Sequence, residues 1–178
     1  MPRLFTGLEM PAETAMMLSS LRGGLRNARW IDPENYHITL RFIGDIDDRT
    51  ADEVAFALGR INRTPFEIRL GGLAAFGNKK PHSIYAAVAP NPQLAELQAE
   101  QERIIQRLGL PAERRKFIPH VTICRCKGSA TADVARWLAM RGGFSAQPFI
   151  AGRFVLYSSK ASTGGGPYLI EEAYPLAA

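Results

Sequence analysis

The amino-acid sequence predicts an α+β protein with two pseudo-symmetric lobes, each an antiparallel sheet with helices outside, and an active-site cleft between them. Three observations predict this fold. Short runs of β-branched and apolar residues are interspersed with longer stretches in which apolar residues recur at helical spacing. Turns rich in glycine and proline join the short runs, which is typical of antiparallel hairpins. A His-x-Thr motif occurs twice, with similar segments after each copy.

The two copies belong to a repeat with a single offset of 83 residues, which holds over nearly thirty residues of each half. This spacing indicates a duplicated strand–helix–strand–strand unit. Because no linker or low-complexity segment separates the halves, we expect residues 1–178 to form a single bilobal domain. Three pairs of positions show the offset: His37 and His120, Thr39 and Thr122, and Pro65 and Pro148.

The chain begins with a strand and a helix that precede the first copy of the motif. The apolar run at 4–10 predicts a strand. Pro11 suits the first turn of a helix that we expect to run to about Leu25. The first motif lies on a predicted strand at 36–43, which stops at Gly44.

The rest of the first half completes the unit. Asp47 and Asp48 are suitable N-caps for a helix whose apolar side chains recur at helical spacing. The alternating segment at 66–76 and the apolar segment at 83–89 predict two strands, joined by a basic turn.

The second half repeats this order after a long helix at 92–108 and a loop at 111–119. A strand carries the second motif, a helix follows at 131–140, and two strands close the chain at 149–157 and 168–174. Three glycines at 164–166 predict a flexible turn between those last strands.

Composition favours a polyanionic partner. The chain has 178 residues, 46% hydrophobic and 22% charged, which is sufficient for a core of its own. Its formal net charge of +5 attracts RNA or a phosphorylated nucleotide. No stretch approaches the roughly 18 apolar residues of a membrane helix, and the N-terminal apolar run is too short for a secretory signal. We therefore expect a cytoplasmic protein without a membrane partner, and the sequence indicates no obligate protein partner.

The two cysteines, Cys124 and Cys126, are separated by one residue on a predicted strand. Such a pair rarely reaches disulfide geometry. No cluster of histidines and cysteines completes a zinc site. We expect reduced cysteines, no metal and no cofactor.

The motif predicts acid–base chemistry on a phosphate. In a strand, residues i and i+2 project from the same face, so each histidine accompanies its threonine. Imidazole titrates near pH 6.5, so His37 and His120 are suited to act as a general acid and a general base. The hydroxyls of Thr39 and Thr122 are donors for phosphoryl oxygens. Neither role requires a metal.

Several neighbouring residues are candidates for binding the substrate. Strict alternation places Arg41 on the face of His37, but places Arg125 away from His120 unless a bulge intervenes. The cluster Arg114-Arg115-Lys116 precedes the second motif and suits either solvent or an RNA backbone. The remaining histidine, His82, is expected on the surface. The candidates for stacking on a base are Tyr36, Phe76 and Tyr85.

At these residues the sequence resembles the 2H phosphoesterase superfamily, and specifically the bacterial RNA 2′,3′-cyclic phosphodiesterases that were first called 2′-5′ RNA ligases. The resemblance covers nearly the whole chain and rests on the segments RLFTGLEMP, NYHITLRFIGD, PFEIRLGGLAAFG, KFIPHVTICR and FVLYSS. It implies hydrolysis of ribonucleoside 2′,3′-cyclic phosphates to 2′-phosphomonoesters without metal.

The resemblance also implies roles for five residues. His37 is similar to the proton donor to the leaving 3′ oxygen, and His120 to the base that activates water. Thr39 and Thr122 match phosphate-binding threonines. Arg125 matches an arginine that often follows the second motif, which favours a bulged strand. Tyr85 departs from the tryptophan found in many relatives, which leaves the base preference open.

Three other interpretations stay open. The chain is alternatively a 2′-5′ RNA ligase, or a phosphodiesterase for other cyclic or 2′-5′-linked nucleotides, and the products formed from each substrate distinguish these. A non-catalytic RNA-binding module would bind with salt-dependent affinity and form no product. A zinc protein has the least support, because three dispersed histidines lack ligand spacing.

Overall fold

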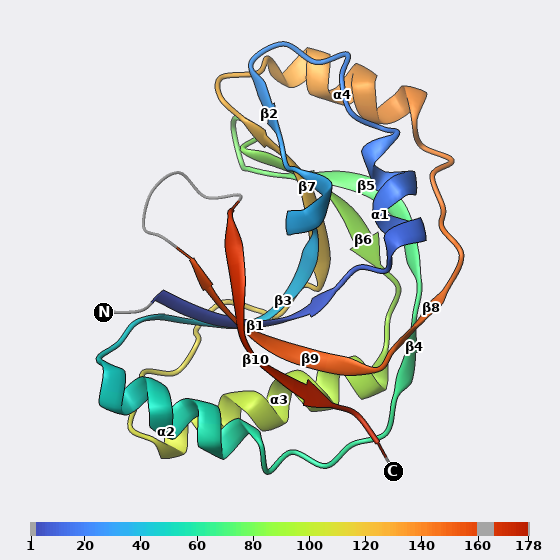
Figure 1. Ribbon diagram of the computed structural model, residues 1–178. Coiled ribbons are helices and arrows are strands. Elements are labelled where there is room, and N and C mark those ends of the chain that lie inside the picture. Colours follow the sequence, from blue (N-terminus) through green and yellow to red (C-terminus); the bar gives the residue numbers. More distant parts are fainter. Residues whose placement is uncertain (1–2, 160–165, 178) are drawn as a thin grey trace.

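The computed structural model describes residues 3–159 and 166–177 and confirms the α+β fold (Figure 1). The turn expected at Gly164 and Gly165 lies outside these residues. The elements in chain order are β1 (Arg3–Glu9), α1 (Ala12–Ser19), β2 (Ala28–Trp30), the 3₁₀ turn η1 (Pro33–Asn35), β3 (His37–Asp45), α2 (Asp48–Leu58), β4 (Phe66–Ile68), β5 (Leu70–Phe76), β6 (Ser83–Val88), α3 (Pro92–Arg107), β7 (His120–Cys126), α4 (Thr131–Met140), β8 (Phe149–Ala151), β9 (Arg153–Ser159) and β10 (Tyr168–Pro175).

Most strands belong to one antiparallel sheet in the order β10-β9-β1-β3-β7-β6-β5, and β2 pairs with β7. The strands that carry the two motifs, β3 and β7, meet in the middle of this sheet. They pair through one position only, Ile38 opposite Val121. The sheet is therefore continuous, but its two halves are joined by a narrow connection.

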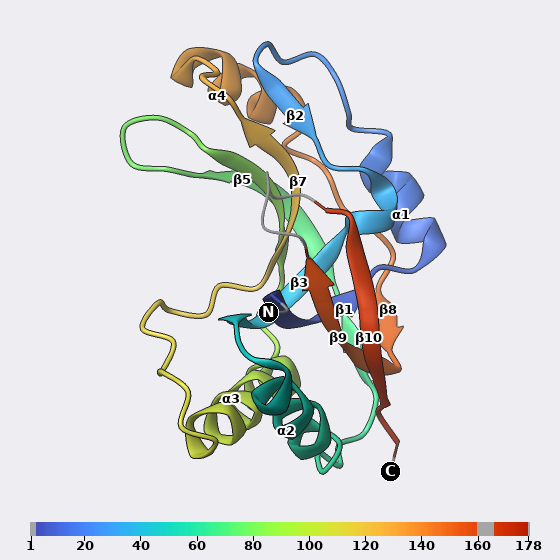
Figure 2. The same cartoon turned by 60° about the vertical axis from the view of Figure 1, so that its left-hand side comes forward.

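The two halves of the sheet form two lobes (Figure 1). The first lobe contains β1, β3, β9 and β10, with α2 and α3 beside it, and the second contains β2, β5, β6 and β7, with α1 and α4 beside it. The strands that follow each motif in sequence thus lie in the lobe of the other motif: β5 and β6 beside β7, and β9 and β10 on the far side of β1 from β3. The turn between β5 and β6 projects from the second lobe (Figure 2).

Three expected elements have other boundaries in the structure. Helix α1 ends at Ser19 and not near Leu25. Gly23 and Gly24, with φ of 98° and 80°, adopt a left-handed backbone that a continuing helix excludes. The single strands expected at 66–76 and 149–157 are each divided, because β4 and β8 leave the main sheet and pair with each other.

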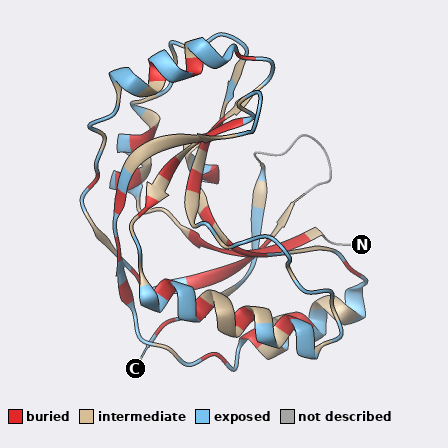
Figure 3. Cartoon of the chain, turned by 180° about the vertical axis from the view of Figure 1, so that it is seen from behind, coloured by how far each residue is buried: buried red, intermediate tan, exposed pale blue. Residues whose placement is uncertain are grey.

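The core lies between the sheet and the helices. Figure 3 shows buried residues along the strands and exposed residues on the outer sides of the helices. On the motif strands, Ile38, Val121 and Ile123 have no exposed surface. Leu97 and Ile105 are likewise fully buried and give α3 its apolar side. Because these apolar side chains of β3 and β7 are held in the core, the histidines and threonines of the two motifs lie on the opposite face of the sheet.

Among residues 3–159 and 166–177, no helix is long and apolar enough to cross a membrane. Within the same ranges, no group of three or more His, Cys, Asp or Glu side chains is arranged to hold a metal ion. Cys124 is buried, Cys126 is partly buried, and both are free thiols.

Candidate active site

The two motifs meet at one cavity. Burial alternates along each motif, with Ile38 and Val121 in the core and both histidines on the other face. The pairing of Ile38 with Val121 brings these faces together. The cavity has a volume of about 330 Å³ and is lined by the five residues to which the family resemblance assigns roles: His37, Thr39, His120, Thr122 and Arg125.

Both imidazoles are oriented in the same way. The Nδ1 of His37 lies 2.8 Å from the carbonyl oxygen of Asn35, and the Nδ1 of His120 lies 2.6 Å from that of Ile118. A carbonyl oxygen only accepts, so each Nδ1 carries a proton and donates it. The Nε2 atom of each ring is thus left for proton transfer. In His37 this atom also lies 2.9 Å from Oγ1 of Thr39.

The two rings differ in their electrostatic surroundings. Burial lowers the pKa of His37 to about 4, the hydrogen bond to Asn35 opposes this, and the charges of His120 and Arg125 add to the lowering. Burial also lowers the pKa of His120, opposed by the Ile118 carbonyl and assisted by Arg125. Both rings of the protein alone are therefore neutral at pH 7. A bound anion would favour their protonation.

A bulge in β7 explains how Arg125 reaches the cavity. Tyr85 pairs with Thr122 and Ile84 with Cys124, so Ile123 has no opposite residue. The extra residue reverses the alternation, and Arg125 turns to the face of the histidines. Its Nε is buried and has no hydrogen-bond partner among the described residues. A guanidinium in this position is suited to bind an anion in the cavity.

The equivalent bulge in β3 removes Arg41 from the cavity, and the expectation from strict alternation was wrong. Thr6 pairs with Arg41 and Gly7 with Thr39, so Leu40 is the extra residue. Arg41 is 5% exposed and forms an ion pair with Glu102 on the opposite side of the strand. It is therefore not available to contact RNA.

Aromatic side chains surround each histidine. Phe5 and Tyr168 each lie 5.0 Å from His37 between ring centroids. Phe76 and Tyr85 lie 4.8 Å and 5.3 Å from His120 and stack on each other. These two remain candidates for contact with a base. Tyr36 does not, because it is 2% exposed and belongs to the core.

The other candidates lie outside the cavity. Arg114, Arg115 and Lys116 are exposed, and Arg115 is paired with Glu113. His82 is exposed, as expected, and its ring is parallel to that of Phe76.

Sequence reasoning missed other residues of the cavity wall, among them Arg3, Asn35, Phe42 and Tyr168. Phe42 stands 83 residues before Arg125, so the repeat offset was a signal for it. Asn35 precedes the motif by two residues and is 8% exposed. Arg3 is brought to the site by the pairing of β1 with β3, and Tyr168 by the pairing of β10 with β9 and of β9 with β1, which the sequence does not reveal.

The chain resembles known proteins in sequence and in structure. A family model described as LigT like Phosphoesterase matches residues 8–85 and 87–168. Proteins named RNA 2′,3′-cyclic phosphodiesterase are similar. The one from Aeropyrum pernix is 38% identical over 101 residues, covering 56% of this chain and 57% of that protein. The one from Bacillus subtilis is 25% identical over 167 residues, covering 90% and 86%.

The first of these matches spans little more than half of the relative's length. Among solved structures, Escherichia coli LigT complexed with 3′-AMP aligns with a TM-score of 0.82 at 21% identity, covering 99% of both chains. A protein of Thermus thermophilus aligns with a TM-score of 0.81 at 22% identity, covering 98% of this chain and 97% of the other. At these identities the likeness concerns the fold.

Proposed function

Because the chain belongs to the LigT-like phosphoesterase family, we propose that it is an RNA 2′,3′-cyclic phosphodiesterase that forms 2′-phosphomonoesters without metal. The observation that supports this most directly is the pair of imidazoles at one cavity. Each has its Nδ1 proton donated to a backbone carbonyl and its Nε2 left for proton transfer. The substrate class also agrees with the name of the relatives, RNA 2′,3′-cyclic phosphodiesterase.

In the proposed reaction, Nε2 of His120 accepts a proton from water as the water oxygen attacks phosphorus. The bond between phosphorus and the 3′ oxygen breaks, and Nε2 of His37 donates a proton to that oxygen. The phosphate remains on the 2′ oxygen. Thr39 and Thr122 donate hydrogen bonds to the phosphoryl oxygens, and the guanidinium of Arg125 offsets their charge.

Substrate binding favours the uptake of a proton from solvent by the acid, His37. The pKa of His37 is about 4 in the protein alone, so the ring is neutral at pH 7. The negative charge of a bound cyclic phosphate favours the imidazolium and opposes the effect of burial. His37 thus becomes charged only when a phosphate is beside it.

The test is hydrolysis of a 2′,3′-cyclic nucleotide in the presence of EDTA, with the product identified by phosphorus NMR. We expect the 2′-phosphate. His37→Gln and His120→Gln should each lower kcat by about 10²- to 10⁴-fold, because each removes one proton transfer.

The matched control is His82→Gln, which replaces the exposed third histidine and should leave kcat unchanged. Undiminished turnover in either cavity variant would exclude the mechanism. A 3′-phosphate product would reverse the identity of the leaving oxygen, and complete inhibition by EDTA would show that the reaction depends on metal.

A further inference from the structure

His120 is oriented by a loop that has little regular structure of its own. The carbonyl that accepts its Nδ1 proton belongs to Ile118. Residues 109–119 connect α3 to β7 without a helix or strand, and the Ile118 side chain is 47% exposed. The matching carbonyl for His37 belongs to Asn35, a buried residue of the turn η1. The orientation of the His120 ring thus depends on the contacts that hold this loop in place.

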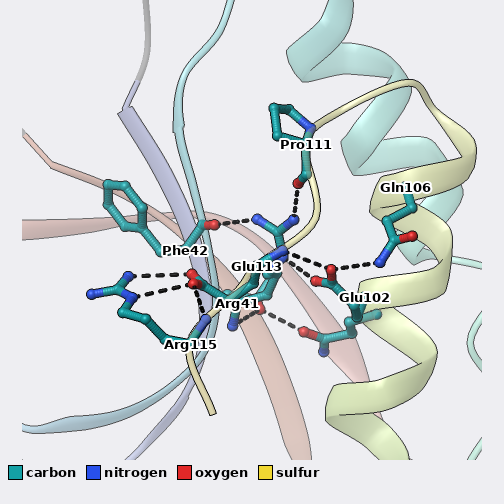
Figure 4. A network of polar contacts seen from close by, with 9 residues as sticks. Arg41, Phe42, Glu102, Gln106, Pro111, Glu113 and Arg115 are labelled. Carbon is teal, nitrogen blue, oxygen red and sulfur yellow. Dashed lines mark hydrogen bonds and ion pairs between the residues drawn. The ribbon is translucent and has the colours of Figure 1, made fainter. Parts of the chain in front are cut away.

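Arg41 and Glu102 hold the first part of the loop at two backbone groups (Figure 4). The Nη2 of Arg41 donates to the carbonyl oxygen of Pro111, and its Nε is paired with the carboxylate of Glu102. The other oxygen of Glu102 accepts the backbone N–H of Glu113 at 2.9 Å. The Arg41–Glu102 ion pair therefore binds the loop at two points, the carbonyl oxygen of Pro111 and the backbone N–H of Glu113.

Further contacts keep the carboxylates charged. Gln106 donates to Glu102 at 2.7 Å, and Arg115 donates to Glu113 through its backbone and its guanidinium. Burial raises the pKa of Glu102, but the hydrogen bonds from Arg41, Glu113 and Gln106 outweigh it, so the net pKa is lowered. Hydrogen bonds from Arg115 lower the pKa of Glu113 to about 2.

The network binds the first lobe to the loop that leads into the second lobe. Arg41 lies on β3, four residues after His37, and the bulge at Leu40 directs it toward α3. The loop that it holds leads directly into β7. The only strand pairing between β3 and β7 is that of Ile38 with Val121. The strand of one histidine thereby supports the loop that orients the other.

We propose that Arg41 and Glu102 are positioning residues that fix the imidazole of His120 relative to that of His37. Their role in the reaction rests on the proposed function, whereas their effect on the His120 ring does not. Neither residue lines the cavity. They act through the backbone of the loop and the carbonyl of Ile118.

The kinetic test compares Arg41→Met and Glu102→Gln with the wild type. We expect kcat to fall about 10- to 100-fold with little change in KM, because a small displacement of a reacting group has an effect of this size. Arg41→Lys should recover part of the activity, since a lysine retains the charge but not all three hydrogen bonds of the guanidinium, which go to Glu102 and to the carbonyl oxygens of Phe42 and Pro111.

A matched control is Arg63→Met. Arg63 is also bound to α3, through Glu100 and Glu96, and it is 28% exposed, but it does not contact the loop. This variant should lose stability in urea while kcat stays unchanged. If Arg63→Met and Arg41→Met lower kcat equally, the effect is a general loss of structure and the proposal is wrong.

A measurement without substrate separates the proposal from the proposed function. Nitrogen-15 NMR of the histidine rings should show the Nδ1–H tautomer of His120 in the wild type and a mixture of tautomers in Glu102→Gln and Arg41→Met. The His37 ring should be unchanged. If the His120 signals are the same in all three proteins, the positioning role is overturned. If they change in a protein that hydrolyses no cyclic phosphate, the positioning role stands and the substrate assignment fails.

Discussion

At the residue scale, the two histidines share their backbone contacts and differ in burial. Each donates Nδ1–H to the carbonyl two residues before it. His37 is enclosed by Phe5, Tyr157 and Tyr168, and its pKa is lowered to about 4. The symmetric repeat therefore places its two histidines in unequal surroundings.

The buried histidine makes folding sensitive to acid. In the unfolded chain His37 binds a proton below about pH 6.5, whereas in the folded protein it remains neutral until about pH 4. Its contribution to the free energy of unfolding is thus fully present above pH 6.5 and is lost as the pH falls toward 4. We expect urea denaturation to show a loss of about 3 kcal/mol over this range that His37→Phe abolishes.

His82→Phe is the control for that comparison, because His82 is exposed and its replacement should leave the acid sensitivity as it is. Carboxylates also titrate in this pH range, but they do so equally in the wild type, His37→Phe and His82→Phe. Equal pH dependence of the wild type and His37→Phe would contradict the low pKa.

At the element scale, the bulges in β3 and β7 decide which arginine reaches the cavity. The sequence was sufficient to place both histidines and threonines, because the repeat offset and the alternation of a strand determine their face. It was not sufficient for Arg41, because the extra residue at Leu40 is visible only in the pairing of β3 with β1. For Arg125, alternation alone predicted the wrong face, and only the family resemblance favoured a bulge.

The pairing of β1 with β3 depends on Gly7. A Cβ atom on this residue would lie 2.7 Å from the carbonyl oxygen of Ile38 and 3.2 Å from the ring of Tyr157. Gly7→Ala should therefore destabilise the protein by about 1 to 3 kcal/mol. It should also lower kcat, because β3 carries His37.

Gly71→Ala is the matched control in another strand of the same sheet, since a Cβ there meets nothing within 4 Å. Urea denaturation and kcat of the two variants provide the measurement. The tight contact at Gly7 would be disproved if both variants were equally stable.

At the scale of the whole molecule, we propose that the chain forms one bilobal domain, because strands from both halves of the sequence build each lobe. The repeat predicted two related units. It did not predict that the strands after each motif cross to the other lobe, because pairing between distant strands leaves no local pattern. The boundaries of β4 and β8 were missed for the same reason, whereas the early end of α1 has the local cause of Gly23 and Gly24.

The net charge of +5 suggests how substrates of different length behave. A longer RNA brings more phosphates close to this positively charged protein. Each additional contact between a phosphate and a basic side chain makes the binding affinity more sensitive to salt. KM for an oligoribonucleotide with a 2′,3′-cyclic end should rise more steeply with salt than KM for a cyclic mononucleotide. If KM for the oligoribonucleotide and KM for the mononucleotide depend equally on salt, the protein contacts only the terminal nucleotide.

The position of β1 has a consequence for the order in which the protein is made. This strand lies between β3 and β9, so β1 leaves the ribosome well before β9, one of its two partners. The strands of the second lobe are all present once Cys126 has been synthesised. The sheet that carries His120 is thus available to form during translation, while β1 keeps one unpaired edge until Arg153–Ser159 has been synthesised.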